Sequence, residues 1–258
     1  MSKILFSDFD GTLFFKEGFH QEDIEAIQTF QEAGNKFALC TGRPLGGVLA
    51  LMEGKIKPDY YVLCTGGLVL DKDYHVVYGQ EIPFYLVKEV CQKYENETIT
   101  GPHCLDKDYL YFAHVPSDAP SYIKQFDSID EFIERDLEVI KVEAFSHDET
   151  EIQKVIPYFK DMKEIAYLSS YPDNVEITNE NAQKGLILEK VIEQLNIKKE
   201  EVIVLGDGMN DITLFERFPY SFAPNNAEKV IQEKAYKVVS SCKDGAVSEA
   251  IEYALENL

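Results

Sequence analysis

Asp8 and Asp10 directly follow a short apolar run near the start of the chain. On an extended backbone the side chains at i and i+2 point the same way, so both carboxylates are predicted to face one side. Gly11 allows a sharp turn just beyond them. Two carboxylates held together repel each other, which favours a shared divalent cation or a raised pKa on one of them. A simple helix cap is the alternative; an EF-hand calcium loop is excluded, because Thr12 and Phe19 stand where it needs oxygen ligands.

Three later segments carry further polar residues at the predicted ends of strands. Thr41 precedes a predicted helix, and a helix N-terminus can hold an anion. Lys184 stands in the first turn of another helix, where a cation opposes the helix dipole and therefore suggests a nearby anion. Asp207 follows a strongly apolar strand, and Asn210 and Asp211 come about one turn later. Taken singly, each residue also fits an ordinary helix cap or a surface lysine.

The elements that must position these residues alternate between strand and helix. Strands are predicted over 3–9, 36–40, 60–64, 201–205, 220–223 and 237–239, and helices over 21–33, from Pro44, over 184–195, from Met209, and over 226–234 and 245–257. This order is typical of a doubly wound parallel sheet with right-handed crossovers. In such sheets, polar residues at the strand tips meet in one ligand-binding crevice.

The middle of the chain breaks this rhythm. Residues 68–70 and 76–78 flank a turn and predict a hairpin. Beyond it, helices are predicted near 84–97, 128–136 and 148–161, and strands over 109–115, 138–146, 165–169 and 174–178. A stretch of about one hundred residues is too long for a connecting loop, so we expect an inserted domain with its own core.

Composition narrows the class of protein. The chain has 258 residues and a formal net charge of −21, with 46 acidic and 25 basic residues. This balance argues against nucleic acid and against an anionic membrane surface as partners. No apolar run approaches the ~20 residues of a membrane span, and Asp8 interrupts the first run too early for a signal peptide. With an odd number of cysteines and no Cys-x-x-Cys pair, we expect a reduced, cytoplasmic protein.

Taken together, the polar segments resemble the four motifs of haloacid dehalogenase-like phosphatases. In chain order they are Asp8-Phe9-Asp10-Gly11-Thr12-Leu13, Thr41-Gly42-Arg43-Pro44, Lys184-Gly185 and Gly206-Asp207-Gly208-Met209-Asn210-Asp211. The position of the insertion resembles the Cof-type branch, which commonly has Asn-Gly where this chain has Thr65-Gly66. The resemblance implies a Rossmann-like α/β core formed by residues 1–81 and 181–258, with residues 82–180 as an inserted α/β cap domain.

The resemblance also implies a role for each motif residue. Asp8 would attack phosphorus and form an aspartyl phosphate, while Asp10 would protonate the leaving oxygen and then activate water. Mg²⁺ would be held by Asp8, the main-chain carbonyl of Asp10 and Asp207, with Asp211 orienting that group from behind. The phosphoryl oxygens would be bound by Thr41, Lys184 and Asn210 and by the backbone N–H groups of Phe9 and Gly42. Arg43 could join this clamp, although a structural ion pair is the favoured role.

The cap would close over the core, exclude water and contact the leaving group. Four of its residues could line that surface, although packing within strands is the favoured role for each: His103, Tyr109, Tyr111 and His114. The sequence does not place the cap contacts that set specificity.

The leading hypothesis is a Mg²⁺-dependent phosphatase of small phosphorylated metabolites, with sugar phosphates as the first class. The alternatives are a phosphotransferase or phosphomutase of the phosphomannomutase type, and a non-catalytic protein that binds phosphometabolites. The pair Asp8 and Asp10 argues against a pure binder, because binding has no use for an acid and base at position 10. Nothing in the sequence, such as a coiled-coil heptad, requires an oligomer.

Overall fold

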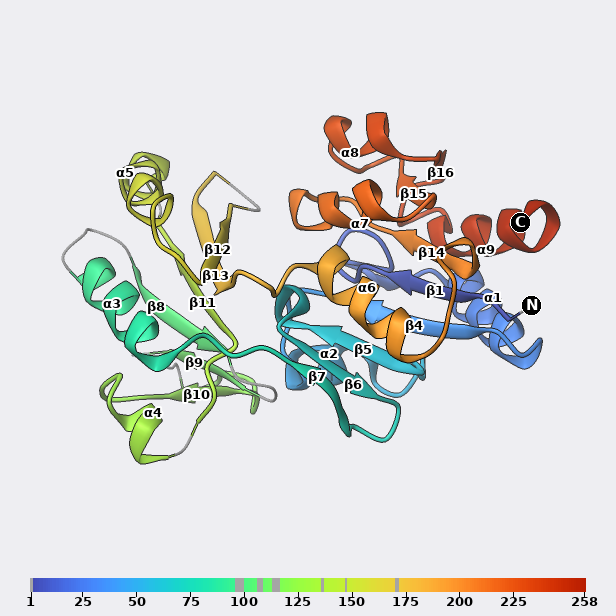
Figure 1. Ribbon diagram of the computed structural model, residues 1–258. Helices are drawn as coiled ribbons and strands as arrows, with labels where there is room; N and C mark the ends of the chain where they lie inside the picture. The colour runs from blue at the N-terminus through green and yellow to red at the C-terminus, as the bar shows by residue number, and fades with distance from the viewer. Residues whose placement is uncertain are drawn as a thin grey trace.

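The computed structural model describes residues 2–95, 100–105, 109–112, 117–135, 137–146, 148–169 and 172–258. Within these residues the chain forms an eight-stranded sheet, a six-stranded sheet and a short two-stranded hairpin. The two larger sheets lie side by side, and both chain ends lie in the part that contains the eight-stranded sheet (Figure 1). Among the described residues, every helix is too short or too polar to cross a lipid bilayer.

The eight-stranded sheet is built outward from β1 (Ile4–Ser7), which pairs in parallel with β4 (Lys36–Cys40) on one side and β14 (Val202–Leu205) on the other. The other strands are β5 (Tyr60–Leu63), β6 (Leu68–Asp71) and β7 (Val76–Gly79) beyond β4, and β15 (Tyr220–Pro224) and β16 (Lys237–Val239) beyond β14. Strands β16 to β5 run parallel. The direction of winding therefore changes between β1 and β14, which confirms the doubly wound α/β class.

Helices cover both faces of this sheet, because each buried strand is apolar on both sides. Leu5 packs with α1 (Gln21–Glu32), α2 (Leu45–Met52) and α9 (Ala246–Asn257). Its neighbours Ile4 and Phe6 point the other way, toward α6 (Lys184–Gln194), α7 (Ile212–Arg217) and α8 (Lys229–Lys234). Three short 3-10 turns complete this part: η1 (Cys64–Gly66), η2 (Lys199–Glu201) and η3 (Met209–Asp211).

The six-stranded sheet has the order β10-β9-β8-β11-β13-β12. Its strands are β8 (Thr100–Leu105), β9 (Leu110–Phe112), β10 (Ile123–Gln125), β11 (Lys141–Phe145), β12 (Ile165–Leu168) and β13 (Asn174–Asn179), and its helices are α3 (Phe84–Glu95), α4 (Glu131–Glu134) and α5 (Glu149–Phe159). Val142 and Val175 pack against α3 and α5 in a separate apolar core. The pleat turns the alternate residues of β11 and β13 to the opposite face, and these residues are mostly polar.

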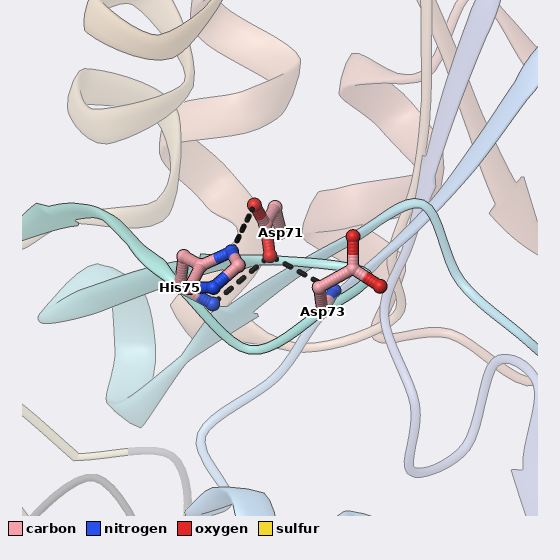
Figure 2. Close-up of side chains that lie close together, drawn as sticks. All are labelled: Asp71, Asp73 and His75. Atoms are coloured by element: carbon pink, nitrogen blue, oxygen red, sulfur yellow. Dashed lines mark hydrogen bonds and ion pairs between the residues drawn. The ribbon is translucent and has the colours of Figure 1, made fainter.

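The predicted hairpin is present as β6 and β7, which pair antiparallel. The Asp71 carboxylate holds its turn: Oδ1 accepts hydrogen bonds from the backbone N–H groups of Asp73 and His75, both at 2.9 Å. Its Oδ2 lies 3.2 Å from Nδ1 of His75 (Figure 2). Because both carboxylate oxygens of Asp71 make contacts within the turn, the cluster of Asp71, Asp73 and His75 is explained by its role in stabilising the turn.

Two chain segments connect the sheets, one before α3 and one after β13. They are joined to each other, because Nδ2 of Asn179 donates a hydrogen bond to the carbonyl of Glu81 at 2.9 Å. The N–H of Ile82 also donates to the carbonyl of Val139 at 2.8 Å. The two connections therefore meet at one place.

Some sequence predictions need correction. Pro44 is the N-cap of α2 rather than its first residue, and the helix expected over 128–136 is confined to Glu131–Glu134. Strands β8 and β10 and the hairpin of β2 (Phe14–Phe15) with β3 (Gly18–Phe19) were not predicted. Gly101 and Pro102 disfavour a strand locally, and pairing with β11 overrides that preference.

Candidate active site

Lys184 joins two of the predicted acidic residues in the interior. Its Nζ lies 2.7 Å from Oδ1 of Asp8 and 2.6 Å from Oδ1 of Asp211. The Lys184 side chain is 0% exposed, so it is not a surface lysine. Burial alone would lower the pKa of Lys184, but the carboxylates of Asp211 and Asp8 raise it well above its ordinary value. The ammonium is therefore a fixed cation beside Asp8.

Close backbone approaches bring these groups together. Asp8 follows β1 directly, and its N–H donates to the carbonyl of Leu205 at the end of β14. A Cβ on Gly185 would lie 2.1 Å from the carbonyl oxygen of Thr213, so only glycine lets the start of α6 sit this close to α7. This contact places Lys184 under the end of β1.

Asp207 faces Asp8 from the tip of β14. Its Oδ1 accepts a hydrogen bond from Oγ1 of Thr12 at 3.0 Å. Gly11 has φ +77°, and a Cβ there would lie 2.3 Å from Oδ2 of Asp207, so glycine is required at that turn. Asp211 holds the loop from behind, because its Oδ2 accepts from the N–H groups of Asp207 at 3.0 Å and Gly208 at 3.2 Å.

The three carboxylates form a candidate metal centre. One oxygen from each of Asp8, Asp207 and Asp211 lies within 4.8 Å of the others. Burial and the Asp211 carboxylate raise the pKa of Asp207 to about 6, and the same two causes raise the pKa of Asp8 well above its ordinary value. A divalent cation relieves this repulsion, and an all-oxygen donor set suits a hard cation. The residues therefore fit the divalent metal that the sequence resemblance implies.

Asp10 lies outside this group of three. Its carboxylate makes a bidentate ion pair with Arg43, with Nε at 2.6 Å and Nη2 at 2.8 Å. The prediction that Arg43 forms an ion pair thus agrees with the geometry, although its partner, Asp10, is a predicted catalytic residue. The Asp10 side chain is 46% exposed and borders the same cavity, so it can turn toward a bound molecule.

The residues predicted to bind phosphate surround the same space. Thr41 is 1% exposed, and its Oγ1 accepts a hydrogen bond from the N–H of Arg43 at 3.2 Å. Thr41, Gly42 and Asn210 line a cavity of about 630 Å³ together with Asp8 and Asp207. The Phe9 side chain is buried in the core and stacks on Phe14, so only the backbone of Phe9 is suited to an anion.

Residues of the six-stranded sheet and of the turn before β10 line the other side of this cavity. They are Lys141, Glu143, Asn174 and Glu176 in the sheet and Tyr122 in the turn. Lys141 is 3% exposed, and its Nζ lies 2.9 Å from Oε2 of Glu176. Glu176 in turn accepts a hydrogen bond at 3.0 Å from Oγ1 of Thr65, which follows β5 in the other sheet. A Cβ on Gly42 would lie 3.5 Å from Nζ of Lys141, so this ammonium reaches the turn predicted to bind phosphate.

Sequence reasoning missed these residues, although a signal existed. Lys141 and Glu143 alternate with apolar residues along β11, which is the pattern of a strand with one polar face. Of the residues named instead, Tyr111 is 1% exposed and packs in the apolar core, and Tyr109 contacts the Tyr111 ring edge to face. The favoured packing role is thus confirmed for Tyr111. His114 and the side chain of His103 lie outside what the structure describes.

Known proteins are similar to this one over almost the whole chain. A model of the haloacid dehalogenase-like hydrolase family matches residues 5–251. The 5-amino-6-(5-phospho-D-ribitylamino)uracil phosphatase YwtE of Bacillus subtilis is 26% identical, over 98% of both chains. Phosphatase YwpJ of Bacillus subtilis is 22% identical, over 98% of this chain and 100% of its own.

Solved structures share the fold. A haloacid dehalogenase-like hydrolase from B. subtilis superimposes with a TM-score of 0.90 at 20% identity, covering 97% of this chain and 99% of that one. The HAD subclass IIB sugar phosphatase BT4131 gives a TM-score of 0.81 at 23% identity, covering 98% of each chain. The family match and the shared fold extend across both sheets. The chain therefore belongs to the haloacid dehalogenase-like hydrolases, as a phosphatase of their Cof-type branch.

Proposed function

We propose that this protein is a Mg²⁺-dependent phosphatase of small phosphorylated metabolites, with sugar and polyol phosphates as the main class, acting through an aspartyl phosphate on Asp8. In this proposal residues 1–81 and 181–258 form the catalytic core, and residues 82–180 form the cap. The observation that carries it is the Lys184 ammonium between Asp8 and Asp211, with Asp207 beside them. Bound between these carboxylates, Mg²⁺ would supply positive charge against the phosphoryl oxygens.

In the first step an oxygen of Asp8 attacks phosphorus, and the bond from phosphorus to the ester oxygen breaks. Lys184 holds Oδ1 of Asp8 at 2.7 Å, which fixes the carboxylate and makes Oδ2 the oxygen that attacks. Asp10, released from Arg43 and carrying the proton that it took from water in the second step of the previous turnover, gives that proton to the departing ester oxygen. Thr41, Asn210 and the backbone at Gly42 hold the phosphoryl oxygens.

In the second step Asp10 removes a proton from water, and the water oxygen attacks phosphorus. The bond between phosphorus and Asp8 breaks, which releases inorganic phosphate and restores the Asp8 carboxylate. The cap wall is the side of the cavity lined by Tyr122, Lys141, Glu143, Asn174 and Glu176. It covers the turn at Thr41 and Gly42 and limits the access of bulk water.

Two similar proteins support the substrate class. YwtE acts on a phosphorylated ribitylamino compound, and BT4131 is a sugar phosphatase. The cavity of about 630 Å³ suits a metabolite of that size. The buried thiols of Cys40, Cys64, Cys91 and Cys242 support action in the reducing cytoplasm.

The proposal is tested by measuring inorganic phosphate released from a panel of phosphorylated metabolites, with Mg²⁺ and again with EDTA. We expect release that requires the metal and that falls at least ~10³-fold in Asp8→Asn, which keeps the shape of the side chain but removes the nucleophile. Asp73→Asn is the matched control, because Asp73 is exposed in the β6–β7 turn. Metal-independent release, or full activity in Asp8→Asn, would contradict the proposal.

A further inference from the structure

The cavity is lined by more acidic groups than phosphate binding requires. Six carboxylates line the cavity: Asp8, Asp10, Glu143, Glu176, Asp207 and Glu228. Only Arg43 and Lys141 oppose them among its described lining residues. Asp8 and Asp207 belong to the candidate metal centre, Asp10 is paired with Arg43, and Glu228 accepts a hydrogen bond from the N–H of Met209. Glu143 and Glu176 are the acidic groups that the six-stranded sheet contributes to the cavity.

Lys141 does not offer a spare positive charge to this region. Its Nζ lies 2.9 Å from Oε2 of Glu176 and 3.2 Å from Oε2 of Glu143. Glu176 is held in that position, because it also accepts the hydrogen bond from Thr65. Two carboxylates therefore surround one ammonium, and this part of the wall keeps a net negative charge.

The other nearby cations are committed as well. Arg43 makes its bidentate pair with Asp10, and the fully buried Lys184 bridges Asp8 and Asp211. Within the described part of the cavity, each cation is thus already paired with a carboxylate. A second anionic group on a substrate would have to displace one of these pairs.

Hydroxyl groups suit this wall much better. A carboxylate accepts several hydrogen bonds, and a hydroxyl can donate to it without placing like charges together. The Glu143 side chain is 30% exposed, so it is the acidic group of the cap wall most open to a ligand. Tyr122 and Asn174 add further polar contacts on the same wall.

We infer that the cavity discriminates against phosphate monoesters whose leaving group carries a second anionic group, and that Glu143 is the residue that rejects this group. This inference rests on the proposed phosphatase function and narrows its substrate class. Like charges brought together at a binding surface are strongly disfavoured, which gives the discrimination its physical basis.

The test compares pairs of substrates that differ by one anionic group. The pairs are glucose 6-phosphate with 6-phosphogluconate, fructose 6-phosphate with fructose 1,6-bisphosphate, and glycerol 3-phosphate with 3-phosphoglycerate. In each pair we expect kcat/KM to favour the neutral leaving group by about tenfold or more. Equal or higher kcat/KM for the anionic members would overturn the inference.

Glu143→Gln tests the assigned residue, because glutamine keeps the size of the side chain and one acceptor oxygen but removes its charge. We expect the ratio of kcat/KM within each pair to shrink about threefold or more, mainly through a lower KM for the anionic member. Glu134→Gln is the matched control, because Glu134 is exposed on α4 and does not line the cavity. An unchanged ratio in Glu143→Gln would overturn the role of Glu143.

Binding measurements separate this inference from the proposed catalytic function. The same pairs are titrated calorimetrically onto Asp8→Asn with Mg²⁺, where no turnover is needed. We expect about tenfold tighter binding of the neutral members. If they bind in that order but the wild-type protein releases no phosphate, the proposed function fails and the charge selection stands. Equal affinities, or no binding of either member, would overturn the charge selection.

Discussion

Replacing Lys184 with methionine tests whether the buried ammonium holds the acidic centre together. Methionine has nearly the same length, so the change removes the charge and leaves most of the packing. Asp8 and Asp211 would then each lose an ion-pair partner, at 2.7 and 2.6 Å respectively, and the Lys184 side chain that joins them is fully buried. Removing one partner of a buried ion pair costs about 3–5 kcal/mol. A domain is stable by only about 5–15 kcal/mol, so the loss is a large share.

Urea unfolding followed by circular dichroism measures this loss, since the chain has no tryptophan. With a slope of about 3 kcal/mol per molar, the midpoint in EDTA falls by about 1 M or more. Mg²⁺ should restore part of the loss, because it supplies positive charge to the same carboxylates. Lys184→Met with Asp211→Asn should be less destabilised than the sum of the single variants by about 1–3 kcal/mol. A single variant within 1 kcal/mol of wild type, or full additivity, would refute the reasoning.

The remaining predictions concern the acid, a glycine and pH. Asp10→Asn should reduce kcat far more for alkyl phosphates than for aryl phosphates, because a good leaving group needs no proton; equal losses in phosphate release would contradict the acid role. Gly66→Ala should cost roughly 2 kcal/mol in urea unfolding and also lower kcat, because Gly66 has φ +99° and a Cβ would lie 3.0 Å from the backbone nitrogen of Lys184; wild-type values for both would refute this. Because the pKa of Asp207 is raised to about 6 in the folded state, that state binds a proton more readily than the unfolded one. Stability in EDTA should therefore rise by about 1 kcal/mol as the pH falls from 7 to 5 and lose this dependence in Mg²⁺, whereas the opposite slope would refute the assignment.

The core was predictable because its signals are local. Short runs of β-branched and other apolar residues such as Val202–Leu205 favour buried strands, and the polar residues that follow parallel strands meet at the carboxyl edge of the sheet. That edge brought Asp8, Lys184 and Asp207 together as expected. The sequence could not show that the Asp10 side chain turns to Arg43, because that depends on the relative placement of two loops.

The cap was harder because its elements are short and depend on non-local pairing. β10 has only three residues, and it is a strand because it pairs with β9. The aromatic residues of the cap are among those named as possible lining residues. In the structure, however, Tyr111 faces the apolar core, and the charged residues of β11 face the cavity. The element that packs against a sheet determines which face of each strand is turned away from the core. The sequence pattern alone does not identify that element.

The division of the core into two chain segments has a consequence for folding. Ile4 pairs with Lys36 on one side and with Val202 on the other, so one edge of β1 stays open until the chain beyond the inserted region has been made. Pairings within the six-stranded sheet join residues much closer in sequence, and contacts between near neighbours form faster. During synthesis, we expect the insertion to fold before the unit that carries it, while β1 waits as an exposed strand edge prone to aggregation.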